Sequence, residues 1–121
     1  MILVDTSVWI DYFRGSPACQ ELGALLEGAE IVVHPFVHGE IALGHLGRRR
    51  DQILRDIATL PGVDVVPDAD VLYLVEAQRL GGTGIGWVDA HLLAAALHAR
   101  VVLWTLDRSL SRIASRLRVS R

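Results

Sequence analysis

Short apolar runs alternate with longer segments of helical periodicity along the whole chain. The runs at residues 2–4, 31–33, 63–66 and 101–104 are rich in valine, isoleucine and leucine and predict buried strands. Apolar positions spaced three to four residues apart, bounded by cap and turn residues, predict the intervening helices. These predicted helices span residues 8–14, 18–27, 36–46, 52–60, 67–80, 87–99 and 107–117.

Strands that alternate with helices indicate a mostly parallel sheet covered by helices on both faces. We therefore predict an α/β fold, a three-layer sandwich with a central, mostly parallel sheet of four to five strands. Residues 118–119 are the expected source of a weak edge strand. The length of 121 residues suits one domain, and no linker or repeat divides it, so residues 1–121 are expected to form a single domain.

The composition is apolar for a small domain, with 51% hydrophobic residues and a mean hydropathy of +0.36. No apolar run approaches the roughly 18 residues of a membrane-spanning helix. Asp5 follows the apolar residues 1–4 directly and no basic segment precedes them, so we expect no signal peptide and a cytoplasmic location. The surplus of apolar residues predicts a protein partner or self-association.

Charge and cysteine content exclude several kinds of site. All 12 basic residues are arginines, so sites that need a lysine amine, such as a P-loop or a Schiff base, are excluded. A response-regulator receiver and a haloacid-dehalogenase-like phosphatase both require a lysine, and the latter also needs an aspartate where Ser7 stands. Cys19 is the only cysteine, which excludes an internal disulfide and a thiolate zinc cluster.

Two aspartates follow predicted strands directly. Asp5 ends the first strand and Asp107 comes just after the last. Because ligands of parallel sheets bind beyond the carboxyl ends of the strands, these two side chains are expected to be neighbours there. Taken singly, each is equally compatible with a helix N-cap.

Two further acids lie on apolar faces of predicted helices. Leu93 and Ala96 follow Asp89 at i+4 and i+7, so its carboxylate is expected to point inward. Glu40 repeats the pattern, with Phe36 at i−4 and Leu43 at i+3. Each is also compatible with an interior acid held by an arginine or by backbone donors.

Four carboxylates at one edge would repel one another unless a divalent cation neutralised them. Oxygen ligands of this kind suit Mg²⁺ or Mn²⁺, whereas zinc favours histidine or cysteine. We therefore expect a magnesium or manganese site.

Four segments resemble VapC-type toxins of the PIN-domain ribonuclease family. Residues 1–10 (MILVDTSVWI) resemble the opening of these domains, and residues 84–94 (GIGWVDAHLLA) resemble the segment with the third acid. Residues 36–41 (FVHGEI) and 103–108 (LWTLDR) resemble the segments with the second and fourth acids. Together they span nearly the whole chain in the family's order.

The resemblance implies a metal-dependent endoribonuclease, the toxin of a type II toxin–antitoxin (VapBC) pair, that leaves the phosphate on the 5′ end of its product. It places the acidic quartet on Asp5, Glu40, Asp89 and Asp107, with Asp5 and Asp89 as direct metal ligands. It also implies a VapB-type antitoxin as partner, an RNA substrate, and a homodimer that forms a heterotetramer or larger assembly with antitoxin. The neighbouring hydroxyl residues are Thr6, Ser7 and Thr105.

The alternative is a degenerate PIN domain that binds RNA or protein without cleavage, against which the intact quartet argues. The histidines, His38 and His91 among them, are expected at the surface or in an interface, because on a helix each points away from its neighbouring acid. The arginines at 48–50 fit a solvated helix start better than an RNA contact.

An aromatic side is also expected on the first helix. Its residues Trp9, Tyr12 and Phe13 fit core packing, and a groove for a partner helix is the second interpretation.

Overall fold

Three short parallel strands form the central sheet of the computed structural model, which describes residues 1–121. They are β1 (Ile2–Val4), β2 (Ile31–Val32) and β3 (Val102–Trp104), in the order β2-β1-β3. Ile2 pairs with Ile31 on one side and with Val102 on the other. The middle strand is buried on both faces, which explains its unbroken apolar sequence.

The sheet is smaller than the four to five strands predicted. At one edge the segment at 63–66 is no strand, and only a single parallel bridge between Val33 and Gly62 remains there. Val63 enters the core but Val65 is 42% exposed, so burial does not hold the rest of this segment against the sheet. At the other edge the C-terminal segment makes one bridge, between Leu103 and Ser120.

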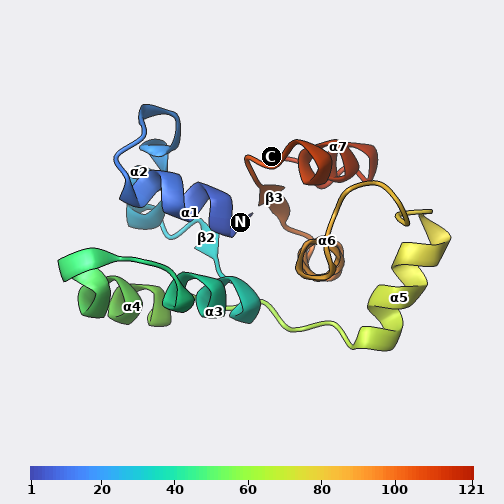
Figure 1. Ribbon diagram of the computed structural model, residues 1–121, viewed down its shortest axis with the longest axis horizontal. Coiled ribbons are helices and arrows are strands. Elements are labelled where there is room, and N and C mark those ends of the chain that lie inside the picture. The colour runs from blue at the N-terminus through green and yellow to red at the C-terminus, as the bar shows by residue number, and fades with distance from the viewer.

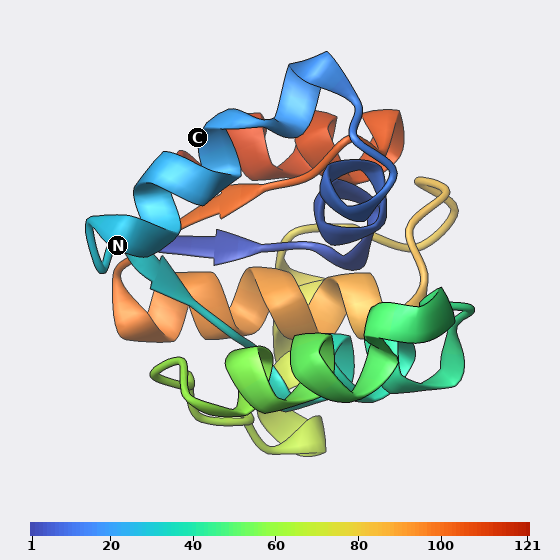
Figure 2. The ribbon, with the colours of Figure 1, turned by 90° about the vertical axis from the view of Figure 1, so that its left-hand side faces the viewer.

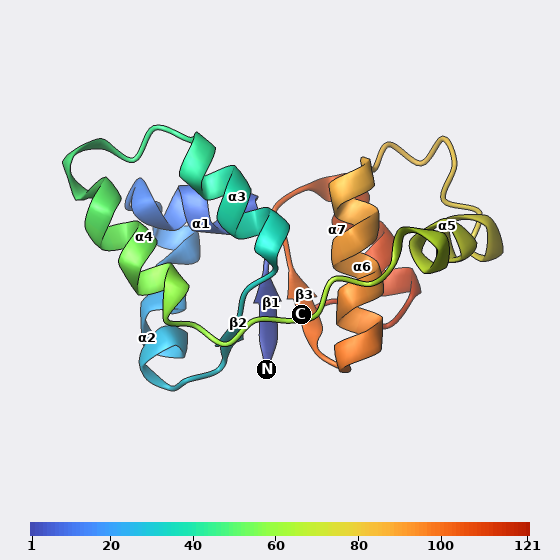
Figure 3. The same ribbon diagram turned by 90° about the horizontal axis from the view of Figure 1, so that it is seen from below.

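Helices cover both faces of the sheet, as the three-layer prediction requires (Figures 1 and 3). One layer contains α1 (Thr6–Phe13), α2 (Glu21–Glu27), α3 (Pro35–Leu43) and α4 (Arg50–Ala58). The other contains α5 (Asp68–Ala77), α6 (Trp87–Ala99) and α7 (Arg108–Arg116). Single 3₁₀ turns at Pro17–Cys19 and Gly47–Arg49 precede α2 and α4.

Most helix boundaries lie within a few residues of their prediction, and α6 spans the predicted residues. The third helix ends early, at Leu43, because Gly44 adopts an extended conformation. The fifth ends at Ala77, and Arg79 then takes a left-handed conformation with a φ of 55°. The spacing of apolar residues, from which the helices were predicted, does not indicate either of these turns.

The strands point toward the end of the molecule at which α6 begins (Figure 2). Helix α6 packs against β3 and α5, and its residues from Ala90 to Ala96 are all buried. It therefore lies inside the fold, and its first turn adjoins the carboxyl edge of the sheet. No helix is long and apolar enough to cross a membrane.

Candidate active site

Asp5 lies at the centre of a hydrogen-bonded group at the carboxyl edge of the sheet. Val4 and Trp104 are paired in the parallel β1–β3 ladder, so Asp5 and Thr105 are the next residues along neighbouring strands. The Oδ2 atom of Asp5 accepts hydrogen bonds from Ser7 Oγ and Thr105 Oγ1, both at 2.7 Å. Asp5 is 7% exposed, so these two donors replace solvation that the carboxylate loses.

The same two hydroxyls hold the loop that carries the fourth acid. The Leu106 N–H donates to Ser7 Oγ at 3.0 Å, and the Asp107 N–H donates to Thr105 Oγ1 at 3.1 Å. Each hydroxyl thus donates to Asp5 and accepts from the loop after β3. The position of Asp107 is therefore coupled to that of Asp5 through side chains on two different segments.

Asp107 is also the N-cap of α7. Its Oδ1 accepts from the Leu110 N–H at 2.8 Å, and the side chain is exposed. Its Oδ2 has no hydrogen-bond partner in the protein. The capping interpretation is therefore correct, and one oxygen is left for a ligand.

Asp89 is half-buried in the first turn of α6. Its Oδ2 accepts from the Gly86 N–H at 2.9 Å, which fixes the carboxylate at the start of the helix. Burial raises the pKa of Asp89 above its ordinary value, against the lowering effect of the Gly86 hydrogen bond. The negative charges of Asp5, Asp107 and Glu40 raise this pKa further. The other three acids thus lie close enough to repel the Asp89 carboxylate.

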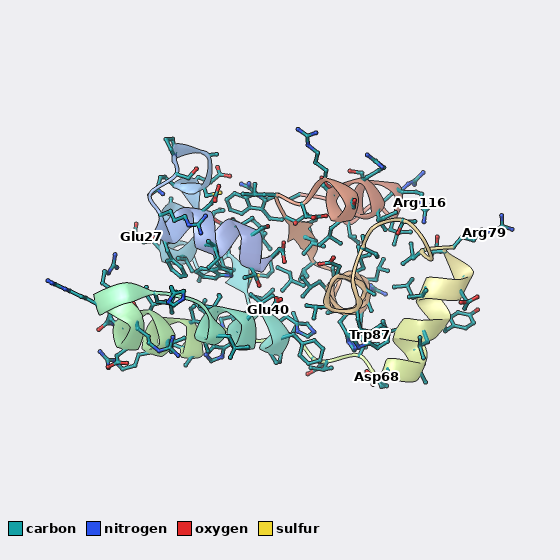
Figure 4. All side chains as sticks on the ribbon, viewed as in Figure 1. Glu27, Glu40, Asp68, Arg79, Trp87 and Arg116 are labelled. Atoms are coloured by element: carbon teal, nitrogen blue, oxygen red, sulfur yellow. The ribbon has the colours of Figure 1, made fainter.

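Glu40 comes to this edge from α3, but not by pointing into an apolar core as predicted. Glu40 is exposed. Leu43, which was expected to mark a buried face, is itself 90% exposed. The core side of α3 consists of Val37 and Ile41. Glu40 Oε1 accepts from Thr6 Oγ1 at 2.8 Å, and Figure 4 places Glu40 on the side of α3 that faces α6.

The donor set fits a hard divalent cation. Each of the four carboxylates keeps one oxygen without a hydrogen-bond partner in the protein, and no arginine forms a salt bridge with any of them. No three of the histidine, cysteine and acidic side chains are close enough to ligate one ion together. Mg²⁺ usually takes only one or two carboxylates and fills its remaining positions with water and phosphate oxygens, so the set remains suitable.

Two histidines expected at the surface or in an interface are instead fully buried within the domain. His91 lies on α6, where its Nε2 is 3.1 Å from Asp68 Oδ1, and His34 caps α3 by accepting the Phe36 N–H at Nδ1. Burial, and to a smaller extent the charge of the neighbouring His91, lower the pKa of His34 to about 4. The prediction failed because α6 is covered on nearly its whole circumference, so the side opposite Asp89 does not face solvent.

An apolar groove of about 510 Å³ lies between α1, α2 and α4. Trp9 is 2% exposed and belongs to the core, as the default interpretation holds. Tyr12 and Phe13 are only partly buried, and together with Leu26 and Ile53 they line the groove. Trp9 also contributes to this lining. The core interpretation of the aromatic side is therefore confirmed for Trp9, and the groove for a partner helix stays a prediction.

Comparison with known proteins agrees with this geometry. The family model described as PIN domain matches residues 2–116. The chain is 46% identical over 111 residues to Ribonuclease VapC32 from two Mycobacterium tuberculosis strains, CDC 1551 / Oshkosh and ATCC 25618 / H37Rv. The match covers 91% of this chain and 87% of each relative.

Its fold is also similar to the crystal structure of FitAcB from Neisseria gonorrhoeae. The TM-score is 0.65 at 21% identity, over 95% of this chain and 94% of that one. At this identity the likeness concerns the fold alone, whereas the family model and the sequence relatives also identify the family. The chain belongs to the VapC-type ribonucleases of the PIN-domain family.

Proposed function

We propose that this chain, as a single PIN domain of residues 1–121, is the toxin of a VapBC toxin–antitoxin pair. We further propose that it hydrolyses RNA phosphodiester bonds with Mg²⁺ or Mn²⁺ in the cytoplasm. The observation that carries the proposal is the gathering of Asp5, Glu40, Asp89 and Asp107 at one edge of the sheet, where burial and then the charges of the other three acids raise the pKa of Asp89. The 46% identity to Ribonuclease VapC32 supports RNA as substrate.

Asp5 and Asp89 are the proposed metal ligands. In each carboxylate one oxygen is fixed by hydrogen bonds, in Asp5 from two hydroxyls and in Asp89 from the Gly86 N–H. The second oxygen of each has no partner in the protein. A bound divalent metal lowers the pKa of a coordinated water and offsets charge that develops on the phosphate. Ser7 and Thr105 are positioning residues, since they orient Asp5 rather than contact substrate.

Glu40 and Asp107 have different surroundings and are assigned a different role. Both are exposed and each keeps an oxygen that contacts no protein group. They are suited to orient the attacking water or to hold a second metal ion. Thr6 positions Glu40 through its hydroxyl, which donates to Glu40 Oε1.

The test is cleavage of RNA by the purified protein with Mg²⁺ or Mn²⁺, in parallel with EDTA, followed by analysis of the product ends. We expect cleavage only with metal and phosphate on the 5′ end. Asp89→Asn removes charge but little volume and should abolish cleavage while keeping the fold. Asp70→Asn is the matched control, because Asp70 also lies in the first turn of a helix but on α5, and it should cleave normally.

Cleavage in EDTA, or by a folded Asp89→Asn protein, would contradict the metal mechanism. A folded wild-type protein that binds RNA but cleaves none with either metal would instead match the alternative of a degenerate PIN domain. The four acids, each with a free oxygen, argue for the catalytic protein.

We also propose that the groove between α1, α2 and α4 binds a VapB-type antitoxin. Its lining of Tyr12, Phe13, Leu26 and Ile53 suits the apolar face of an amphipathic helix. Arg49 and Asp56 at the same groove supply polar contacts for residues that flank this apolar face. An antitoxin bound here lies against α1, whose first turn carries Thr6 and Ser7 of the active site.

The toxin itself is proposed to be a homodimer that forms a heterotetramer or larger assembly with antitoxin. The outer surface of α5 and α6 supports this, since Leu72, Tyr73 and Leu97 are 55%, 76% and 38% exposed. Tyr73 and Leu97 line the same surface hollow, and exposed apolar side chains that gather in this way mark a protein interface. Light scattering on Tyr73→Glu should show a monomer if this surface forms the dimer, and an unchanged dimer would place the interface elsewhere.

A further inference from the structure

The charges of this chain are unevenly distributed along the sequence. All 14 acidic residues lie at or before Asp107, whereas residues 108–121 contain five of the 12 arginines and no acid. The overall net charge of −2 conceals this division. The C-terminal segment is therefore a strongly basic surface that begins directly after the fourth acid of the active site.

Three of these arginines form a row on α7. Arg108, Arg112 and Arg116 recur every four residues, so they lie on one side of the helix, and all three are exposed. The opposite side, with Leu110 and Ile113, packs into the core. At 1.5 Å per residue the row is about 12 Å long.

The row begins at the active site. Asp107, the N-cap of α7, is bonded to Thr105 and hence to Asp5, so Arg108 lies at the carboxylate edge. From there α7 runs back along the outside of the molecule, over the sheet (Figures 1 and 2). The basic row therefore leads away from the acids.

The arginines nearest the site have no partner within the protein. The structure contains two ion pairs, one between His91 and Asp68 and one between Arg121 and Glu21, and neither uses this row. The guanidinium groups of Arg108 and Arg112 make no hydrogen bond within the protein either. Arg116 donates to the Gln78 carbonyl near the end of α5 and forms no ion pair with an acidic side chain (Figure 4).

This arrangement is unfavourable for the isolated helix, because like charges four residues apart repel each other. It becomes favourable only when an anion lies along the row. The acidic edge by itself repels a polyanionic substrate, so a cationic surface beside it is needed to hold RNA there. Guanidinium groups suit this role because they bind phosphate oxygens through paired hydrogen bonds.

We propose that Arg108 and Arg112 bind phosphates of the RNA strand that leaves the active site along α7. This inference rests on the proposed ribonuclease function and adds the path of the substrate. These contacts read no bases, so they contribute affinity and register without selecting a sequence.

The other basic surface, at residues 48–50, is less suited to this role. Arg50 already donates to the Ala42 and Gly44 carbonyls, and Arg49 shares the groove with Asp56. Asp51 follows the run directly and further reduces the local positive charge. An RNA path across α4 is therefore the competing outcome of the test.

The experiment measures binding apart from cleavage. Fluorescence anisotropy gives the Kd of a labelled single-stranded RNA for the full chain carrying Asp89→Asn, at salt concentrations from 50 to 200 mM. Arg108→Gln/Arg112→Gln is added to this background. The matched control is Arg14→Gln/Arg100→Gln, which removes the same charge from two exposed arginines with no acidic partner. Thermal melts verify that every variant is folded.

For single-stranded RNA each phosphate contact contributes about 0.7 to the slope of log Kd against log salt concentration. Arg108→Gln/Arg112→Gln should therefore lower the slope by about 1.4, while the control pair leaves it unchanged. Between 50 and 200 mM salt, the Kd of the parent should therefore rise by a factor about sevenfold larger than the Kd of the variant does.

An equal decrease of the slope in the control variant Arg14→Gln/Arg100→Gln would overturn the proposal, because net charge alone would then explain binding. The proposal would also be overturned if Arg48→Gln/Arg49→Gln lowered the slope and Arg108→Gln/Arg112→Gln did not. Cleavage by the wild-type chain is assayed separately on the same RNA. A changed slope without cleavage would refute the ribonuclease proposal alone, and cleavage with an unchanged slope would refute the α7 path alone.

Discussion

Buried His34 should make the stability of this protein fall between neutral and mildly acidic pH. Its imidazole is fully buried and accepts the Phe36 N–H at Nδ1, which requires the neutral ring. Protonation would place a positive charge in the core. It would also make Nδ1 a donor, which would then face the Phe36 N–H, itself a donor. The pKa is accordingly lowered to about 4, first by burial and then by His91.

The direction of the change in stability with pH follows from the protons bound by the unfolded and folded states. In the unfolded chain the pKa of His34 is near its ordinary 6.5, so below that pH the unfolded state binds a proton that the folded state excludes until about pH 4. The stabilisation is complete above pH 6.5 and is lost as pH falls toward 4. The full difference corresponds to about 3 kcal/mol, of which about 2 kcal/mol is lost by pH 5.

The assay is urea unfolding of the wild type and His34→Asn in EDTA at several pH values from 7.5 to 5. Asparagine keeps an N-cap acceptor for Phe36 but does not titrate in this range. The variant should be less stable at pH 7.5, because it leaves space in the core, but its stability should fall less toward pH 5.

The difference between the two profiles isolates His34, since both proteins share all other titrating groups. His45→Asn changes an exposed histidine and should follow the wild type. If His34→Asn instead runs parallel to the wild type over the whole range, the buried imidazole does not carry the pH dependence, and the reasoning is refuted.

Three further outcomes are expected. Thr105→Val removes a donor to Asp5 and an acceptor for the Asp107 N–H, so chemical denaturation should show a loss of about 1–3 kcal/mol and cleavage should fall, whereas Thr105→Ser should retain both. Phe13→Ala should weaken antitoxin binding in calorimetry more than it lowers the melting temperature, while Trp9→Ala should cost about 3–5 kcal/mol of stability, and the reverse pattern would contradict the groove assignment. Cleavage should decline on the acid side, beginning above the ordinary carboxylate range because the pKa of Asp89 is raised, and a rate unchanged down to about pH 4 would exclude this site.

Local sequence determined the order of elements and the ends of the strands in this protein. An unbroken apolar run before Asp5 marks the central strand, and another before Thr105 marks an edge strand in which Leu103 is buried. Because parallel strands end at the same edge, polar residues that follow them must meet. The sequence therefore predicted that Asp5 and Asp107 are neighbours, and in the structure the hydroxyls of Ser7 and Thr105 link Asp5 to the loop that carries Asp107.

Sheet size was decided by tertiary packing. The segment at 63–66 has the composition of a strand, but only Val63 joins the main core, whereas Val66 packs against the separate cluster around Val71 on α5 and α6. Strand propensity describes residues that fit a half-buried surface, and it does not state whether such a surface is available. The edge of the sheet therefore carries a single bridge where a strand was predicted.

Side-chain surroundings also depended on tertiary structure. Helical periodicity shows which residues share a face, and it correctly places Asp89 on a different side of α6 from His91. It does not show which faces other helices cover, and so Glu40 is exposed on α3 while His91 is buried on α6. The hydrogen bond from Thr6 to Glu40 likewise depends on the packing of α1 against α3. Contacts between segments far apart in the chain depend on how the layers pack, and that is a property of all the elements together.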